Sequence, residues 1–180
     1  MGMRAFVTYD KLRQFGSRVD AQVLLKEASR ATGKTVFLSH SSKDHGLLPG
    51  VILILQNHGG QVYVDDVDPE LSKCDFVETA DRLRRAARQC RKLVLLVTPR
   101  TGESKWIPWE LGLGDGKNAA ENVALFPSAE SADDQDWADQ EYLGLYRRIL
   151  WANFENKNPE WLVLDHRNNT AKKLRVWLTS

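Results

Sequence analysis

The chain has 180 residues and a formal net charge of +1, because 25 lysines and arginines face 24 aspartates and glutamates. This near-neutral balance and an apolar share of 42% indicate one folded domain with at most a short appendage, and they make nucleic acid an unexpected partner. The longest apolar runs, Val51–Leu55 and Leu93–Val97, are far shorter than the roughly 20 residues that span a bilayer. Because charge also comes too early for a signal peptide, we expect a cytoplasmic protein without membrane contact.

From residue 34 onward, short apolar runs alternate with helical patterns. Lys34–Ser39 is a β-rich run that is closed by the polar loop His40–Asp44. Apolar residues then recur at spacings of three and four over residues 45–58, which predicts a helix. Gln61–Asp65 is the second predicted strand.

The same alternation continues to the end of the chain. The third predicted strand, Lys92–Val97, is apolar on both faces, as a central parallel strand should be. The remaining predicted elements, in chain order, are a helix over about 76–90, a strand over Lys92–Val97, a helix that starts in a Trp-rich segment near residue 105, a strand over Asn122–Phe126, an acidic solvated loop over 129–141, a helix over Tyr142–Trp151, a strand over Trp161–Asp165 and a closing helix over about 171–178.

Strands that are separated by helices imply parallel pairing with right-handed crossovers. Five strands and five helices predict an α/β fold, a flavodoxin-like three-layer sandwich with a five-stranded parallel sheet in the order 2-1-3-4-5. Residues 1–33 lie outside this unit, and we expect them to form an N-terminal helical extension. Residues 34–180 form the main domain.

The expected strand order indicates where a ligand would bind. In an open parallel sheet, ligands bind beyond the carboxyl ends of the strands, at the point where the strand order reverses. For the order 2-1-3, that point lies between the first and third strands. The loop His40–Asp44 meets the loop Thr98–Trp106 there, and the second loop leads into a helix with Trp109 and Glu110. A loop rich in hydroxyl groups and charge is therefore expected to face two indoles and a carboxylate.

The carboxylate also has a structural interpretation. Glu110 follows Pro108 by two residues, which is typical of a helix start, and an acid there gains about 0.3–1 kcal/mol from the helix dipole. Ile107 has no hydroxyl group with which to complete a capping box. The residues alone therefore support the structural and the functional interpretation equally.

The other residues at this edge have structural alternatives as well. Trp106 and Trp109 are three residues apart, so they share a helix face, which is typical of core packing. Ser42 or Asp44 fits the cap of the helix that follows. The sequence has no His or Cys spacing typical of metal ligands, so we expect no metal site. It also has neither a Walker phosphate-binding loop nor the nucleophile elbow of a serine hydrolase.

Four motifs in this order resemble those of the TIR (Toll/interleukin-1 receptor) domain, in a style closer to bacterial proteins than to animal receptors. They are Val36-Phe-Leu-Ser-His-Ser-Ser-Lys-Asp44, Gly60-Gln-Val-Tyr-Val-Asp65, Leu93-Val-Leu-Leu-Val-Thr-Pro99 and Ser104-Lys-Trp-Ile-Pro-Trp-Glu-Leu111. The resemblance covers about residues 34–178 and implies that residues 34–180 are a TIR domain.

The resemblance implies an activity. Some TIR domains cleave the nicotinamide–ribose bond of NAD+, some of these cyclise the ADP-ribose, and the enzymatic members carry a glutamate where Glu110 stands. The chain is thus expected to be an NAD+ glycohydrolase or ADP-ribosyl cyclase in immune, antiphage signalling. NAD+ is then a substrate, and no cofactor is expected. Expected partners are other copies of the chain, through TIR–TIR contacts, and a downstream effector that responds to the product.

The resemblance and the expected chemistry together assign roles to individual residues. The reaction passes through an oxocarbenium-like ribosyl cation, so the site needs a negative charge near the ribose and exclusion of water. Glu110 is the expected catalytic residue. The expected substrate-binding residues are His40, Ser41, Ser42, Lys43, Asp65, Trp106 and Trp109.

The sequence also departs from the family pattern. The loop after the second strand has Asp68-Pro69 in place of the usual glycines, Trp109 is bulkier than the usual residue, and the acidic stretch 129–141 resembles an insertion. The alternative function is a non-catalytic TIR interaction module that docks partners through the loop 66–75 and the basic helix. A weaker alternative is a nucleotide-binding flavodoxin-like regulator, although the sequence lacks a receiver's acidic cluster after the first strand.

Overall fold

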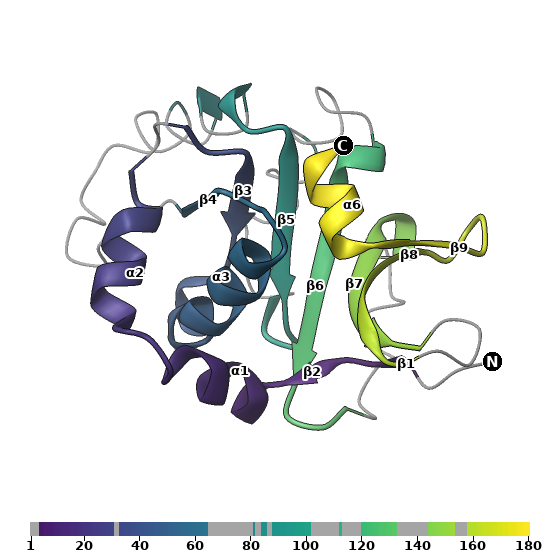
Figure 1. Cartoon of the computed structure of the whole chain (residues 1–180), viewed down its shortest axis with the longest axis horizontal. Coiled ribbons are helices and arrows are strands. Elements are labelled where there is room, and N and C mark those ends of the chain that lie inside the picture. Colours follow the sequence, from purple (N-terminus) through teal and green to yellow (C-terminus); the bar gives the residue numbers. More distant parts are fainter. Residues whose placement is uncertain are drawn as a thin grey trace.

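The apolar runs predicted as the first four strands lie side by side in one parallel sheet (Figure 1). In the sheet they follow the order β4 (Val62–Val64), β3 (Val36–Ser39), β5 (Lys92–Val97) and β6 (Val123–Ala129). This is the predicted order 2-1-3-4. The computed structural model describes residues 4–30, 33–64, 81, 84, 85, 88–101, 112, 120–132, 144–153 and 158–180.

The fifth parallel strand is not the predicted one. β7 (Arg147–Ala152) pairs in parallel with β6, so the helix predicted up to Trp151 is wrong from Arg147 onward. The predicted fifth strand is β8 (Glu160–Asp165), which pairs antiparallel with β7. Hydrophobic periodicity does not show whether a short apolar run such as Ile149–Leu150 is a strand or a helix. Here the run forms a strand because it pairs with β6 on one side and β8 on the other.

A hairpin and a short helix complete the carboxyl-terminal part. β9 (Thr170–Lys173) pairs antiparallel with β8, and Asn169 in the turn between them has φ 50°. The closing helix α6 (Leu174–Thr179) therefore begins three residues later than predicted. The extra strands extend the parallel sheet on one side.

The helix predicted over 45–58 is present, but the helical segment begins three residues earlier and ends at Asn57. Ser42–Leu47 form a 3-10 helix, η1, and the α-helix α3 (Leu48–Asn57) follows it. Gly59 ends the segment with φ 92°, a conformation that favours glycine. The described residues of the helix predicted over 76–90 are helical up to residue 89.

Two helices form in the N-terminal segment, as predicted, together with two short strands that carry no recognisable sequence pattern. The helices are α1 (Tyr9–Gly16) and α2 (Ala21–Ala28). β1 (Arg4–Ala5) pairs antiparallel with β7, and β2 (Val7–Thr8) pairs in parallel with β6. In Figure 1, α1 and β2 lie along the edge of the sheet at which β6 ends. A domain boundary at residue 33 stays a prediction.

Both faces of the sheet are buried. Helices α1, α2, α3 and α6 share one apolar core with alternate residues of the strands, among them Val36, Leu38, Val94, Leu96, Ala124 and Phe126. The residues between them point to the other face and are at most 2% exposed, as seen for Phe37, Leu93, Leu95, Val123 and Leu125. This two-sided burial is typical of a doubly wound sheet. The α/β fold class is therefore confirmed, and the parallel-dominated sheet is compatible with a flavodoxin-like sandwich.

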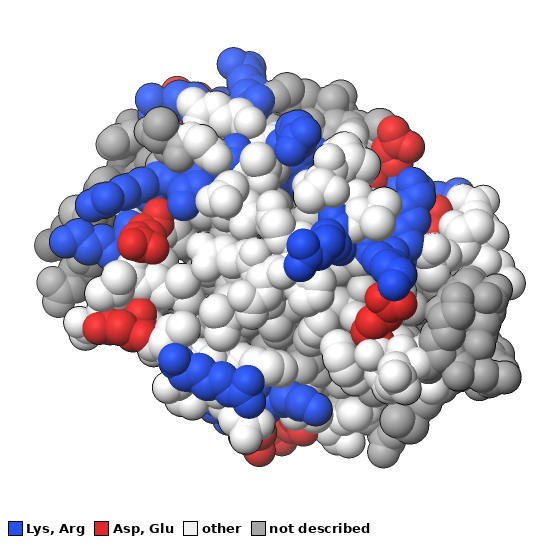
Figure 2. All heavy atoms as spheres, viewed as in Figure 1, with Lys and Arg blue, Asp and Glu red and all other residues white. Residues whose placement is uncertain are grey.

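The charged side chains form no continuous field on the face that carries α1, α3 and α6. Figure 2 shows basic and acidic groups arranged around an uncharged centre. Among the described residues, every helix is too short or too polar to cross a bilayer.

Candidate active site at the switch point of the sheet

The strand order reverses between β3 and β5, which are neighbours with a register that runs from Val36 opposite Lys92 to Ser39 opposite Leu95. From β3 the chain crosses to β4 on one side, and from β5 it crosses to β6 on the other. The loops that follow β3 and β5 therefore leave the sheet at one point. They touch there, because the Thr98 hydroxyl donates a hydrogen bond to Asp44 Oδ2 at 3.0 Å. The predicted meeting of these loops is confirmed.

The loop after β3 presents the predicted polar residues at this edge. The hydroxyl oxygen of Ser41 accepts a hydrogen bond from the backbone N–H of Lys43 at 3.4 Å, so Ser41 caps η1, and the predicted cap at Ser42 or Asp44 is wrong. Ser42 and Lys43 are exposed. His40 is half-buried, and its ring lies 6.4 Å from the ring of His45.

Asp44 was not among the predicted site residues, but it is the most deeply buried residue of this loop. It is 1% exposed, and no group of the described residues bonds its Oδ1. Burial raises the pKa of this carboxyl, against the opposing effects of the Thr98 hydrogen bond and of the Arg100 and Lys43 charges. In sequence it resembles an ordinary cap residue, and only the contact with Thr98 distinguishes it.

The loop after β5 begins with a tightly bonded turn. The backbone N–H of Thr98 donates to the Thr101 hydroxyl at 2.7 Å, and the N–H of Thr101 donates to the Thr98 carbonyl at 2.8 Å. The Thr98 hydroxyl also accepts from the N–H of Arg100 at 3.2 Å. Both threonines are 1% exposed, so water does not compete for these bonds.

The N-terminal segment reaches the same place through Tyr9, the first residue of α1. Tyr9 is 5% exposed, and the guanidinium of Arg100 lies 5.9 Å from the centroid of its ring. Burial raises the pKa of the Tyr9 phenol, whereas a side-chain hydrogen bond with Thr98 lowers it. Three segments that are distant in sequence thus converge on Thr98.

No family model matches the chain. It is 29% identical over 180 residues to a curated protein of Bacillus cereus (strain MSX-D12) that is named "Probable 3' cyclic ADP-D-ribose synthase ThsB'". The similarity covers 97% of this chain and 92% of that protein, and it supports the family that the four motifs indicate. The chain thus resembles the bacterial-type TIR family both in its motifs and along nearly its whole length.

The TIR signature itself falls outside the described residues. Asp65, Trp106, Trp109 and Glu110 are among the residues whose placement is not described, so their roles stay predictions. Within the described ranges, no group of three His, Cys, Asp or Glu side chains is arranged to hold a metal ion. The described part of the candidate site is thus the pair of loops that are joined by Asp44 and Thr98.

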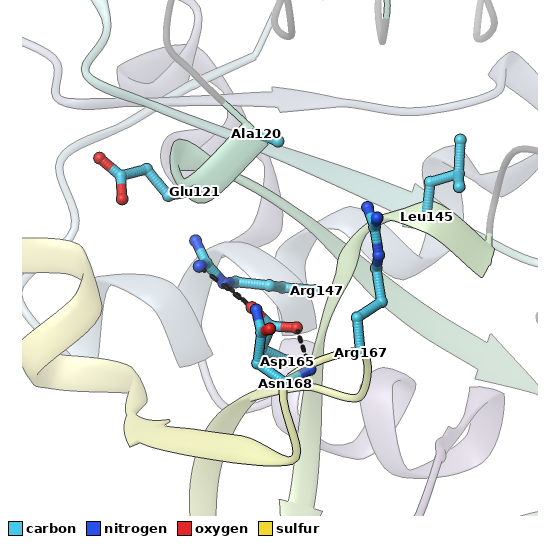
Figure 3. Close-up of a pocket in the computed structure, with 7 residues that line it drawn as sticks. All are labelled: Ala120, Glu121, Leu145, Arg147, Asp165, Arg167 and Asn168. Atoms are coloured by element: carbon cyan, nitrogen blue, oxygen red, sulfur yellow. Dashed lines mark hydrogen bonds and ion pairs between the residues drawn. The ribbon is translucent and has the colours of Figure 1, made fainter.

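A cleft lies at the opposite edge of the sheet (Figure 3). It has a volume of about 260 Å³ and is lined by Ala120, Glu121, Leu145, Arg147, Asp165, Arg167 and Asn168. Arg147 forms an ion pair with Asp165 at 3.2 Å, and the side chain of Asn168 donates to Asp165 at 3.0 Å. Because the cleft borders the starts of β6 and β7, it is not at the switch point.

The buried carboxyl of Asp44 is expected to make the stability of the fold depend on pH. A pKa that is higher in the folded chain than in the unfolded chain contributes stability at low pH, and this contribution is lost as the pH rises through the folded pKa. We therefore expect the free energy of unfolding of the wild type, measured relative to Asp44→Asn, to fall as the pH rises from the ordinary pKa of 3.8.

Urea unfolding of both proteins at a series of pH values measures this difference. Asn keeps a carbonyl oxygen that accepts from Thr98 but has no proton to lose, so it isolates the carboxyl. A difference that stays constant with pH, or that grows in favour of the wild type as the pH rises, would contradict the raised pKa.

Proposed function

We propose that this TIR protein cleaves NAD+ at the nicotinamide–ribose bond, as an enzyme of the NAD+ glycohydrolase or ADP-ribosyl cyclase type. The observation that carries the proposal is the similarity, over 97% of the chain, to a probable 3' cyclic ADP-D-ribose synthase. ADP-ribose is what remains of NAD+ after nicotinamide leaves, which makes NAD+ a direct precursor of such a product. The two polar loops at the switch point lie where a flavodoxin-like sheet binds nucleotides, which also supports the proposal.

The proposed chemistry needs few groups. When the bond between ribose C1 and the pyridinium nitrogen breaks, its electron pair goes to nicotinamide, which leaves as a neutral base without a general acid. The ribose is left as an oxocarbenium-like cation. Its capture by water gives linear ADP-ribose and a proton, whereas its capture by a hydroxyl group of the same molecule gives a cyclic isomer and a proton. We propose that Glu110 holds the ribose hydroxyls and stabilises the developing positive charge.

The loop after β3 supports contacts with the substrate. Ser42 and Lys43 are exposed beyond the end of the strand, where they suit the ribose or phosphate oxygens of NAD+. The Ser41 hydroxyl uses its oxygen to cap η1, so its proton is available for a phosphate oxygen. Among the remaining proposed contacts, His40 and Asp65 border the substrate, and Trp106 and Trp109 enclose the nicotinamide.

The proposed biological setting is antiphage signalling in the cytoplasm. The product would act on a downstream effector, and TIR–TIR contacts would complete the site between copies of the chain. Specific activity should then rise with protein concentration as the copies associate.

The test is to incubate the purified chain with NAD+ over a range of protein concentrations and to measure the nicotinamide released. We expect release, with a specific activity that increases at high concentration. A protein that stays folded and releases no nicotinamide at any concentration would instead support the interaction module. A specific activity that is constant in a proven monomer would exclude a site shared between copies.

A further inference from the structure

The buried pair of Asp44 and Thr98 joins the two loops of the candidate site, across 54 positions in the sequence. We propose that Asp44 is a positioning residue of the NAD+-cleaving site, which holds the loop after β5 against the loop after β3 through its hydrogen bond to Thr98. The inference rests on the proposed function, because it concerns the same site.

The first argument is the burial of the contact. Asp44 and Thr98 are each 1% exposed, and the hydroxyl and the carboxylate oxygen are 3.0 Å apart. A hydrogen bond that is shielded from water is stronger than an exposed one, and breaking it leaves a buried polar group without a partner. The relative position of the two loops is therefore set by a bond that water does not replace.

The second argument is the place of Thr98 in the chain. The turn from Thr98 to Thr101 is closed by two hydrogen bonds, of 2.7 and 2.8 Å, so the path of the chain through these four residues is fixed. Nine positions later the chain reaches Glu110, the proposed catalytic residue. Asp44 thus anchors the base of the segment that carries the proposed catalytic carboxylate.

The third argument is that the buried carboxyl of Asp44 lowers the stability of the fold. Asp44 Oδ1 is buried, and no described residue donates a hydrogen bond to it, which is destabilising for a carboxylate. Tyr9 also forms a side-chain hydrogen bond with Thr98, and the guanidinium of Arg100 lies 5.9 Å from the centroid of the Tyr9 ring. A buried carboxyl that lowers stability, at the one edge of the sheet where a ligand is expected, points to a role in the site.

The test is the steady-state kinetics of NAD+ cleavage by Thr98→Val, which removes the hydroxyl and keeps the shape of the side chain. A displaced catalytic group weakens contacts made in the transition state, so we expect kcat to fall about tenfold while KM stays within about twofold. Thr98→Ser restores the hydroxyl and should recover kcat to within about twofold of the wild type.

A matched control is Thr35→Val, at the other end of β3. It also removes one threonine hydroxyl, which accepts a hydrogen bond from the Gln61 N–H at 3.1 Å, but it lies away from the switch point. All rates are divided by the folded fraction measured by circular dichroism. We expect Thr35→Val to retain kcat to within about twofold.

A double-mutant cycle isolates the bond itself. Asp44→Ala and Thr98→Val break the same contact, so the double variant should lose no more kcat than the more affected single variant. A Thr98→Val protein with unchanged kcat, a loss that Ser does not recover, or losses that multiply in the double variant would overturn the inference while the wild type remains active. A wild type that releases no nicotinamide would overturn the proposed function, and this inference with it.

Discussion

Glu110→Gln is expected to lower the rate of nicotinamide release from NAD+ by at least about 10²–10³-fold, because the proposed site loses the negative charge that faces the ribosyl cation. Glutamine keeps the size and much of the hydrogen-bonding capacity of glutamate, so the variant separates the charge from the shape of the side chain. We expect an unchanged circular dichroism spectrum and an unchanged unfolding midpoint. The measurement is nicotinamide release by equal amounts of folded wild type and variant.

The matched control for this charge removal is Glu121→Gln. Glu121 lines the cleft at the opposite edge of the sheet, so its replacement changes the net charge equally without changing the switch point. We expect it to retain the wild-type rate to within about twofold. A Glu110→Gln protein that still cleaves NAD+ at the wild-type rate would show that Glu110 only begins a helix.

Gly50→Ala is expected to destabilise the fold strongly, because the added methyl group would clash with the backbone of a neighbouring helix. Gly50 lies in the first half of α3, where α1 crosses it, and a Cβ there would lie 2.1 Å from the backbone oxygen of Leu12. Backbone atoms of a packed helix cannot move aside as a flexible side chain does. We expect the free energy of unfolding to fall by at least about 3 kcal/mol and the melting midpoint by about 10 °C.

The matched control is Gly46→Ala, four positions earlier in η1. Among the described residues, no atom other than those of Gly46 itself and its two chain neighbours lies within 4 Å of a Cβ at that position. The added methyl group should leave stability unchanged or raise it by about 0.4–1 kcal/mol, because it restricts the unfolded chain. Equal midpoints for the two variants would mean that α1 and α3 do not pack as closely as described.

The central strands were predictable because each is buried on both faces, so that its sequence is a short apolar run bounded by polar loop residues. Val36–Ser39 and Lys92–Val97 are short apolar runs next to polar loops, and the helix between β3 and β4 has a clear period. β7 was not predictable, because the state of Arg147–Ala152 depends on its pairing with β6 and β8. β1 and β2 have two residues each, which is too few to carry a pattern.

The meeting of the two loops at the candidate site was predictable from strand order alone, whereas their buried connections were not. Parallel strands in the order 2-1-3 bring the loops after β3 and β5 together whatever their side chains are. Asp44 has the sequence context of a cap, and its burial results from a bond to Thr98 that no local pattern encodes. Likewise, Tyr9 lies in a segment that was expected to be an appendage, and the fold places it against the same turn.

The central claim is that this chain breaks the bond between nicotinamide and ribose in NAD+. Mass spectrometry of NAD+ after incubation with concentrated wild-type protein tests it most directly, with Glu110→Gln as the blank. We predict free nicotinamide together with an equal amount of ADP-ribose, either linear or lighter by one water as a cyclic isomer. Intact NAD+ after incubation with folded, self-associated protein would contradict the account.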